Sequence, residues 1–211
     1  MESPFRRPLP DGLRLIETFA RRDGGFVHLA EHLARLGRTA RALEVPFDRA
    51  AIDLALATVD GAGPLRVRLT LTTDGTVAEE APALAPAPAE WRLGIADERL
   101  DPDDPWLRIK TTERRRYDRA RASLPAAIDE WLFLNRRGEV CEGTITNVFL
   151  RAGGALLTPP VACGLLPGVL RGVLLAEGRA REAVLRPADL AEGALLVGNA
   201  LRGLAPARIV G

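Results

Sequence analysis

Lysine occurs only once in this chain, and it can do chemistry that the abundant arginine cannot. Lysine and arginine together number 29, and Lys110 is the only lysine among them. A side chain that forms a Schiff base with a carbonyl must offer a nucleophilic amine, which a guanidinium does not have near neutral pH. A codon bias toward arginine would also leave lysine scarce, and a single lysine would then need no functional explanation. Lys110 by itself is therefore compatible with a reactive amine and with chance.

A second pattern, HLAEH at residues 28–32, has the residue types of a metal site. It matches H-x-x-E-H, in which two histidines on one helix face bind Zn²⁺ and the glutamate activates water. His28, Glu31 and His32 would take these roles, but the sequence marks no third ligand. Positions 28, 31, 32 and 35 also form an arc off the leucine stripe of a helix, where polar residues are ordinary. We favour a polar helix face without a metal, and keep a zinc-binding protein or hydrolase as the alternative of another class.

The elements that would position these residues begin with an α+β region. Hydrophobic periodicity and turn residues predict a strand at 13–20, a turn at 22–25, helices at 28–43 and 47–59, and a hairpin at 64–77. The first helix carries one apolar stripe at 3.6-residue spacing, formed by Leu29, Leu33, Leu36, Ala40 and Leu43. We expect residues 1–85 to form a smaller α+β domain.

The stretch APALAPAPAE, residues 81–90, has the composition of a linker because its prolines are regularly spaced and its first charge is Glu90. Beyond it the sequence predicts strands at 91–96, 130–135, 138–142, 145–150, 154–157 and 193–198, and helices at 113–123 and 168–177. We expect residues 86–211 to form a larger α/β domain that carries Lys110.

Composition limits the classes of partner. The 211 residues are 47% hydrophobic and 27% charged, and their formal net charge of +1 gives no electrostatic case for nucleic acid. Two cysteines, Cys141 and Cys163, are too few for a disulfide scaffold, and no apolar run approaches the ~18 residues of a membrane span. We expect a cytoplasmic protein that acts on a small molecule.

Five segments occur in an order and spacing that resemble one family. They are EHLARL (31–36), KTTERRRYD (110–118), GEVCEGTITNVFL (138–150), GLLPGVLR (164–171) and GNALRGL (198–204). Together they resemble the class IV aminotransferases, the fold type IV pyridoxal-phosphate enzymes, over roughly residues 13–208. The resemblance implies a D-amino-acid aminotransferase-like fold, with a small α+β N-terminal domain and a larger barrel-like C-terminal domain. It also implies pyridoxal 5'-phosphate as the cofactor and a homodimer.

The resemblance assigns roles to individual residues. Lys110 would bind the cofactor covalently and move protons, and Glu142 would face the pyridine nitrogen and keep it protonated. The backbone N–H groups of Val169 and Leu170, at the start of a helix, would bind the phosphate. Arg35 matches the phosphate-binding arginine of the family. Many members have a threonine where Leu170 stands, so backbone donors would have to suffice there.

Three further residues are weaker candidates. Asn199 matches a position that completes the phosphate site in the family. Tyr117 is the only tyrosine, and the family often uses a tyrosine to bind the phenolic oxygen of the cofactor, although usually five rather than seven residues after the lysine. Arg202 could pair with a substrate carboxylate. A tyrosine or an arginine on the surface would explain Tyr117 and Arg202 equally well.

Two reactions remain open within the family. The segments that contain Lys110 and Asn199 look most like those of 4-amino-4-deoxychorismate lyase, which releases pyruvate and 4-aminobenzoate for folate biosynthesis. The alternative is a class IV transaminase of branched-chain or D-amino acids. Both reactions would begin with transfer of a proton from the substrate to Lys110.

Overall fold

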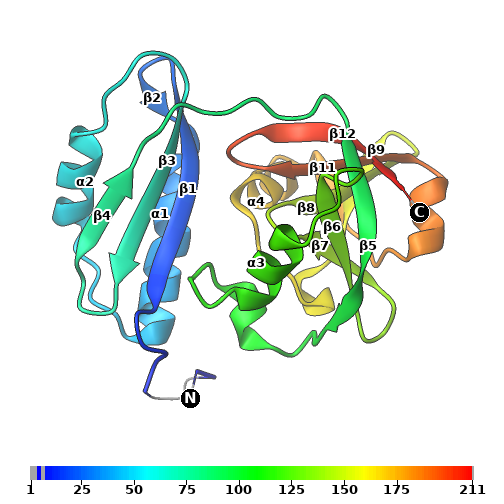
Figure 1. Ribbon diagram of the computed structural model, residues 1–211, viewed down its shortest axis with the longest axis horizontal. Coiled ribbons are helices and arrows are strands. Elements are labelled where there is room, and N and C mark those ends of the chain that lie inside the picture. The colour runs from blue at the N-terminus through cyan, green and yellow to red at the C-terminus, as the bar shows by residue number, and fades with distance from the viewer. Residues whose placement is uncertain (1–3, 6–7, 211) are drawn as a thin grey trace. The chain divides into compact units, whose positions relative to one another are not determined.

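The computed structural model describes residues 4–5 and 8–210, which form two compact units (Figure 1). Unit 1 comprises Met1–Pro86 and Ile109–Glu113, and unit 2 comprises Ala87–Arg108 and Arg114–Gly211. The chain leaves unit 1 within the proline-spaced stretch and returns to it for a short segment that contains Lys110.

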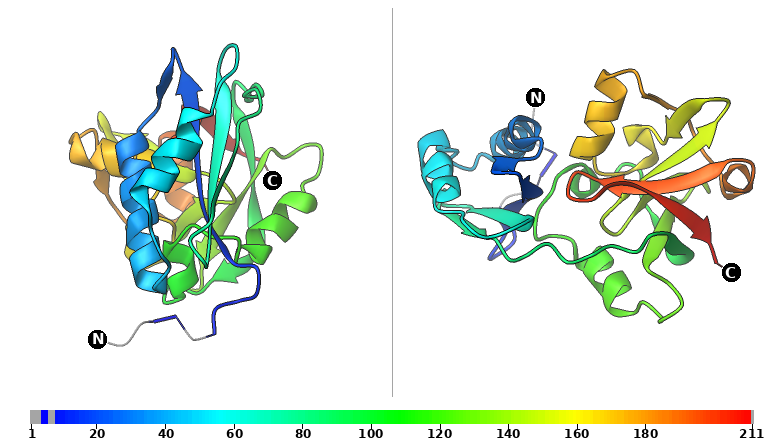
Figure 2. Two further views of the ribbon diagram at one scale, coloured as in Figure 1. Left: turned by 90° about the vertical axis from the view of Figure 1, so that its left-hand side faces the viewer. Right: turned by 90° about the horizontal axis from the view of Figure 1, so that it is seen from above.

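Unit 1 is an antiparallel sheet with two helices on one of its faces (Figure 2). Its strands are β1 (Arg14–Arg22), β2 (Gly25–Phe26), β3 (Leu65–Thr72) and β4 (Val77–Glu80), in the order β2-β1-β3-β4. The helices are α1 (Leu29–Leu43) and α2 (Arg49–Ala57). The alternation predicted for the hairpin is confirmed, because its apolar side chains are buried while their neighbours are half-buried; they are Leu65, Val67, Leu69 and Leu71.

Unit 2 is built around a curved sheet. Its strands are β5 (Trp91–Leu100), β6 (Glu130–Asn135), β7 (Val140–Gly143), β8 (Asn147–Ala152), β9 (Ala155–Thr158), β10 (Ala180–Glu182), β11 (Ala194–Asn199) and β12 (Gly203–Ile209). They follow the order β10-β9-β8-β11-β12-β5-β6-β7, and β7 also pairs with β8. This last pairing closes β8, β11, β12, β5, β6 and β7 into a barrel, as the resemblance implied.

Short helices connect the strands of unit 2. They are α3 (Arg115–Ala122), α4 (Val169–Ala176) and the 3₁₀ helices η1 (Pro105–Arg108), η2 (Val161–Cys163) and η3 (Pro187–Ala191). The main core cluster takes apolar side chains from around the barrel, among them Trp91, Leu132, Val148 and Val197. In the part of the chain that the structure describes, no helix has both the length and the apolar character needed to cross a lipid bilayer.

The sequence missed the strands β10 and β12, as well as the two-residue strand β2. The first has three residues, too few for a periodic signal. The second contains Pro206, which argues against a strand because proline cannot donate to a ladder. Here Pro206 pairs with Leu196 of β11, and β12 pairs with β5 only from Ala207 onward, so Pro206 costs the ladder with β5 no hydrogen bond.

Candidate active site

The segment that carries Lys110 is fixed by its backbone to the edge of β1. The N–H of Ile16 donates to the carbonyl of Lys110 at 2.9 Å, and the N–H of Thr112 donates to the carbonyl of Arg14 at 2.9 Å. The hydroxyl of Thr112 accepts a further hydrogen bond from the N–H of Arg14 at 2.9 Å. The prediction that the larger domain carries Lys110 is therefore wrong, because this pairing places the lysine in unit 1.

Three buried ionisable side chains of unit 1 form one cluster. Arg35 donates from Nε to Oε1 of Glu17 at 2.9 Å and from Nη2 to Oε2 at 2.6 Å. Nδ1 of His32 lies 2.6 Å from the same Oε2. The bidentate pairing gives the Arg35 guanidinium a fixed orientation, because both it and the carboxylate are planar.

The charges in this cluster shift its pKa values. Burial alone would raise the pKa of Glu17, but the charge and hydrogen bonds of Arg35, together with His32, lower it below its ordinary value. Burial lowers the pKa of His32, and the positive charges of Arg35 and Lys110 lower it further against the opposing pull of Glu17. Lys110 therefore acts electrostatically on this cluster within unit 1.

The prediction that positions 28, 31, 32 and 35 form a polar face of α1 is partly wrong. His32 and Arg35 are buried, whereas Glu31 is exposed. The reason is Glu17, which points from β1 toward α1 and gives both side chains a charged partner. Sequence reasoning missed Glu17, although an acid within the predicted strand segment LIETF was the available signal.

The zinc alternative finds no support in this geometry. His28 is the N-cap of α1 with φ 54°, a left-handed backbone conformation, and His32 is buried against Glu17. Among the described residues, no group of three or more histidine, cysteine, aspartate or glutamate side chains is arranged to hold a metal ion.

Glu142 in unit 2 is a buried carboxylate with a donor to each of its oxygens. The hydroxyl of Tyr117 donates to Oε1 at 2.6 Å, and the backbone N–H of Leu166 donates to Oε2 at 3.1 Å. Glu142 lies on β7, which is buried along its whole length. The rigid barrel strand and these donors give this carboxylate a defined orientation.

A second buried carboxylate, Glu130, holds the loop between β7 and β8, residues 144–146. It accepts hydrogen bonds from the N–H groups of Thr144 at 3.1 Å and Ile145 at 3.2 Å, and from the Thr144 hydroxyl at 2.5 Å. Burial raises the pKa of Glu130, although these donors and Arg121 oppose the rise. Sequence reasoning missed Glu130, because its importance depends on a loop that closes the barrel 14 or more residues away.

Helix α4 begins where the sequence predicted a phosphate-binding helix start. Its N-cap is Gly168, and no described side chain caps the helix, so the N–H groups of Val169 and Leu170 open it without a competing side-chain acceptor. Asn147 fixes the preceding chain, because its Nδ2 donates to the carbonyl of Leu166 at 3.0 Å. One side chain thus braces the segment that supplies both a donor to Glu142 and the start of α4.

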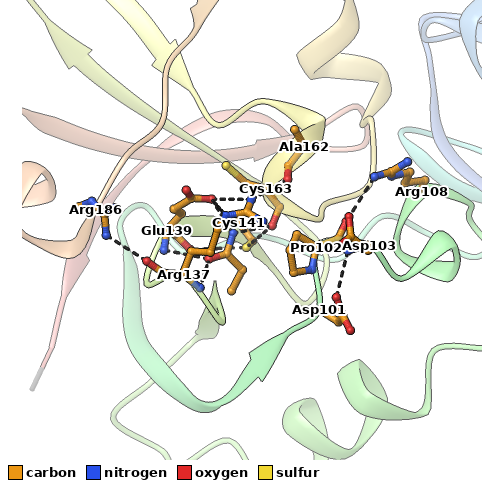
Figure 3. Close-up of polar contacts among 11 residues, drawn as sticks. Asp101, Pro102, Asp103, Arg108, Arg137, Glu139, Cys141, Ala162, Cys163 and Arg186 are labelled. Atoms are coloured by element: carbon orange, nitrogen blue, oxygen red, sulfur yellow. Dashed lines mark hydrogen bonds and ion pairs between the residues drawn. The ribbon is translucent and has the colours of Figure 1, made fainter.

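The connector before α4 is held by a polar network that Figure 3 shows. Arg137 donates from Nη2 to the carbonyl of Ala162 at 2.8 Å, and Asn135 donates from Nδ2 to the carbonyl of Cys163 at 2.9 Å. Sγ of Cys141 also donates to the carbonyl of Cys163, at 3.1 Å. Burial raises the pKa of Cys141 and raises that of Cys163 to about 11, so both thiols stay protonated and serve as structural groups.

Two glycines of this region give a matched test of the helix start. A Cβ added at Gly168 would lie 1.9 Å from Oδ1 of Asn147, whereas a Cβ added at Gly172 in the same helix meets nothing within 4 Å. We expect Gly168→Ala to destabilise the protein by about 1–3 kcal/mol and to weaken phosphate binding. Gly172→Ala should stabilise it by about 0.5–1 kcal/mol. Urea unfolding of both variants measures this, and equal effects would contradict the tight packing at Gly168.

The side chain of Asn199 braces the turn between β11 and β12. Its Nδ2 donates to the carbonyl of Ile145 at 3.1 Å, and its Oδ1 accepts the N–H of Arg202 at 3.0 Å. Asn199 therefore ties this turn to the loop that Glu130 holds. Its role in binding phosphate and the role of Arg202 toward a substrate stay predictions.

The barrel unit and its candidate residues define a class of protein. Residues 14–210 match the family model described as amino-transferase class IV. The chain therefore belongs to the class IV aminotransferase family, whose members are pyridoxal-phosphate-dependent enzymes of fold type IV.

Individual relatives are named either as aminotransferases or as 4-amino-4-deoxychorismate lyases. A candidate amino-acid aminotransferase from Mesorhizobium loti is 45% identical, with a TM-score of 0.89 over 94% of this chain and 100% of that one. The 4-amino-4-deoxychorismate lyase from Pseudomonas aeruginosa is 28% identical, with a TM-score of 0.75 over 93% of this chain and 82% of the other. Aminodeoxychorismate lyase of Saccharomyces cerevisiae is 31% identical over 128 residues, 52% of this chain. The chain spans only 33% of that yeast protein.

The donors in this chain fit the cofactor of the family. Pyridoxal phosphate requires an amine, a carboxylate for its ring nitrogen and donors for its phosphate. Unit 1 supplies Lys110 on a fixed backbone and the buried Arg35. Unit 2 supplies the oriented carboxylate of Glu142 and the helix start at Val169 and Leu170. Each chemical requirement is thus met by at least one described residue.

Proposed function

We propose that the protein is a pyridoxal-phosphate-dependent lyase that converts 4-amino-4-deoxychorismate to pyruvate and 4-aminobenzoate. The observation that carries this choice is the turn after β11, where Asn199 and Arg202 stand in place of the Thr-Ala-Ala-Glu type loop usual in transaminases. The lyase names of the yeast and Pseudomonas aeruginosa relatives support it.

In this proposal the cofactor is bound by residues at both of its ends. Lys110 would hold it covalently, and Glu142, whose orientation is set by Tyr117 and Leu166, would face the pyridine nitrogen. Arg35 and the N–H groups at the start of α4 would donate hydrogen bonds to the phosphate. When bound, the cofactor withdraws electrons from the substrate carbon that bears the amino group, which weakens the C–H bond there.

The residues of the chain then move protons and hold the substrate. The Lys110 amine would accept the proton from the carbon that bears the amino group. The bond between the ring and the oxygen of the pyruvyl group breaks, the ring becomes aromatic, and the departing pyruvate receives a proton in return. Arg202 pairs with a carboxylate of the substrate. In the net reaction, one substrate molecule gives one pyruvate and one 4-aminobenzoate, and no other reactant is consumed.

A transaminase of branched-chain or D-amino acids is the second candidate. The observation in its favour is the 45% identity to the Mesorhizobium loti protein, whose name is that of an aminotransferase. Both reactions use the same cofactor residues and the same first proton transfer, so they differ only in the later steps.

Product analysis separates the two reactions. We expect the protein, supplied with pyridoxal phosphate and 4-amino-4-deoxychorismate but with no 2-oxo acid, to release pyruvate and 4-aminobenzoate in equal amounts. A transaminase would instead need a 2-oxo acid acceptor and would consume it in proportion to the amino acid used. Turnover that appears only with an acceptor would overturn the lyase proposal.

A further inference from the structure

Helix α3 presents one face to the segment that contains Glu142. Arg114, Tyr117 and Arg121 lie at the i, i+3 and i+7 spacing of a single helix face. Arg114 donates from Nη2 to the carbonyl of Thr144 at 2.9 Å, and Arg121 donates from Nη1 to the Thr144 hydroxyl at 3.1 Å. Tyr117, between them, reaches Glu142.

The ring of Tyr117 is held on two sides. The guanidinium carbon of Arg114 lies 5.6 Å from its centroid, and Phe133 packs edge to face at a centroid distance of 5.3 Å. Burial raises the pKa of Tyr117 well above its ordinary value, and the charge of Glu142 raises it further, so the hydroxyl keeps its proton. Its contact of 2.6 Å with Oε1 is within the range of a hydrogen bond to a charged oxygen.

We propose that Tyr117 is a positioning residue for Glu142. It fixes the carboxylate plane together with the N–H of Leu166, so that Glu142 is oriented before the pyridine nitrogen of the cofactor binds. This inference rests on the proposed cofactor role of Glu142. It gives Tyr117 a different task from binding the phenolic oxygen of the cofactor, which was expected from the resemblance.

A double-mutant cycle on cofactor affinity tests the proposal. The dissociation constant of pyridoxal phosphate is measured for the wild type, Tyr117→Phe, Glu142→Gln and the double variant. We expect Tyr117→Phe to weaken binding about tenfold, the effect of one hydrogen bond to a charged group. In the Glu142→Gln background the same change should have an effect of less than about twofold, because the carboxylate through which Tyr117 acts is gone.

A second measurement is independent of cofactor and of any change in side-chain volume. Because Tyr117 is the only tyrosine, feeding 3-fluorotyrosine labels this position alone. The protein without cofactor should give one fluorine resonance, and Glu142→Gln should shift it. An unshifted resonance would contradict the hydrogen bond even if Tyr117→Phe failed to fold.

Arg116→Gln is the matched control on the same helix. Arg116 donates from Nε to Glu98 at 2.7 Å and lies 3.7 Å from Asp104, so its replacement should leave cofactor affinity unchanged within about twofold. Additive losses in the cycle, or equal losses in Arg116→Gln and Tyr117→Phe, would show that Tyr117 only stabilises α3. If the wild type binds no pyridoxal phosphate, both the proposed function and this inference are wrong. If the wild type binds the cofactor but the losses in the cycle are additive, only this inference is wrong.

Discussion

Lys110→Arg is expected to abolish turnover and covalent attachment of the cofactor, although it keeps the positive charge. The reason is chemical, because a guanidinium neither condenses with the cofactor aldehyde nor accepts a proton near neutral pH. Loss of a positioned general base alone costs roughly 10² to 10⁴ in rate. The measurement is the steady-state rate with saturating cofactor, together with retention of the cofactor after dialysis.

A lysine introduced on helix α3 provides the matched control. Arg119 is exposed on α3, so Arg119→Lys should keep wild-type activity, and adding it to Lys110→Arg should restore none. Substantial turnover in Lys110→Arg, or rescue by the lysine at 119, would show that the Lys110 amine is not required. That result would contradict the role assigned to Lys110.

Arg35→Met is expected to lower the free energy of unfolding by about 3–5 kcal/mol at neutral pH, because it leaves Glu17 as a buried carboxylate without its cationic partner. Both side chains are nearly inaccessible, with exposed fractions of 7% and 1%. The loss should be largely recovered in the double variant Glu17→Gln, Arg35→Met, which removes the charge as well as its partner. Urea titration measures both.

The pH dependence of this effect has a defined sign. In the wild type the pKa of Glu17 lies below its ordinary value, so its contribution to stability is present above that value and is lost as the pH falls through the lowered pKa. In Arg35→Met burial dominates, and protonation of Glu17 at acid pH relieves the penalty. The difference in stability between the two proteins should therefore shrink from about pH 7 to about pH 4. A constant difference over this range would contradict the role of Glu17.

The sequence predicted those elements whose side chains alternate or repeat locally. The strand over 130–135 is confirmed with its bounds, and the first helix differs by one residue. The helix buries one apolar face, which its 3.6-residue spacing records directly, and the strand is a short, mostly apolar run that is buried at five of its six positions. The failure at β12 arose because the tolerance of Pro206 depends on how β12 pairs with β11 and on where its ladder with β5 begins, and neither is encoded near Pro206.

The candidate site was predictable where a residue type is chemically irreplaceable, and much less so where its role comes from a partner. Lys110 and Glu142 were assigned from residue type and motif, and their roles stay predictions. Glu17 and Glu130 were missed because their roles depend on side chains 14 or more positions away. Tyr117 was found, but only the fold shows that its hydroxyl meets Glu142.

The most direct test of the central claim is to locate the cofactor on the chain. Borohydride reduction of the protein loaded with pyridoxal phosphate converts a reversible link to an amine into a stable one, and peptide mass analysis then finds the modified residue. We expect a pyridoxyl group on the peptide that contains Lys110, and none in Lys110→Arg. A loaded protein whose Lys110 remains unmodified would contradict the account.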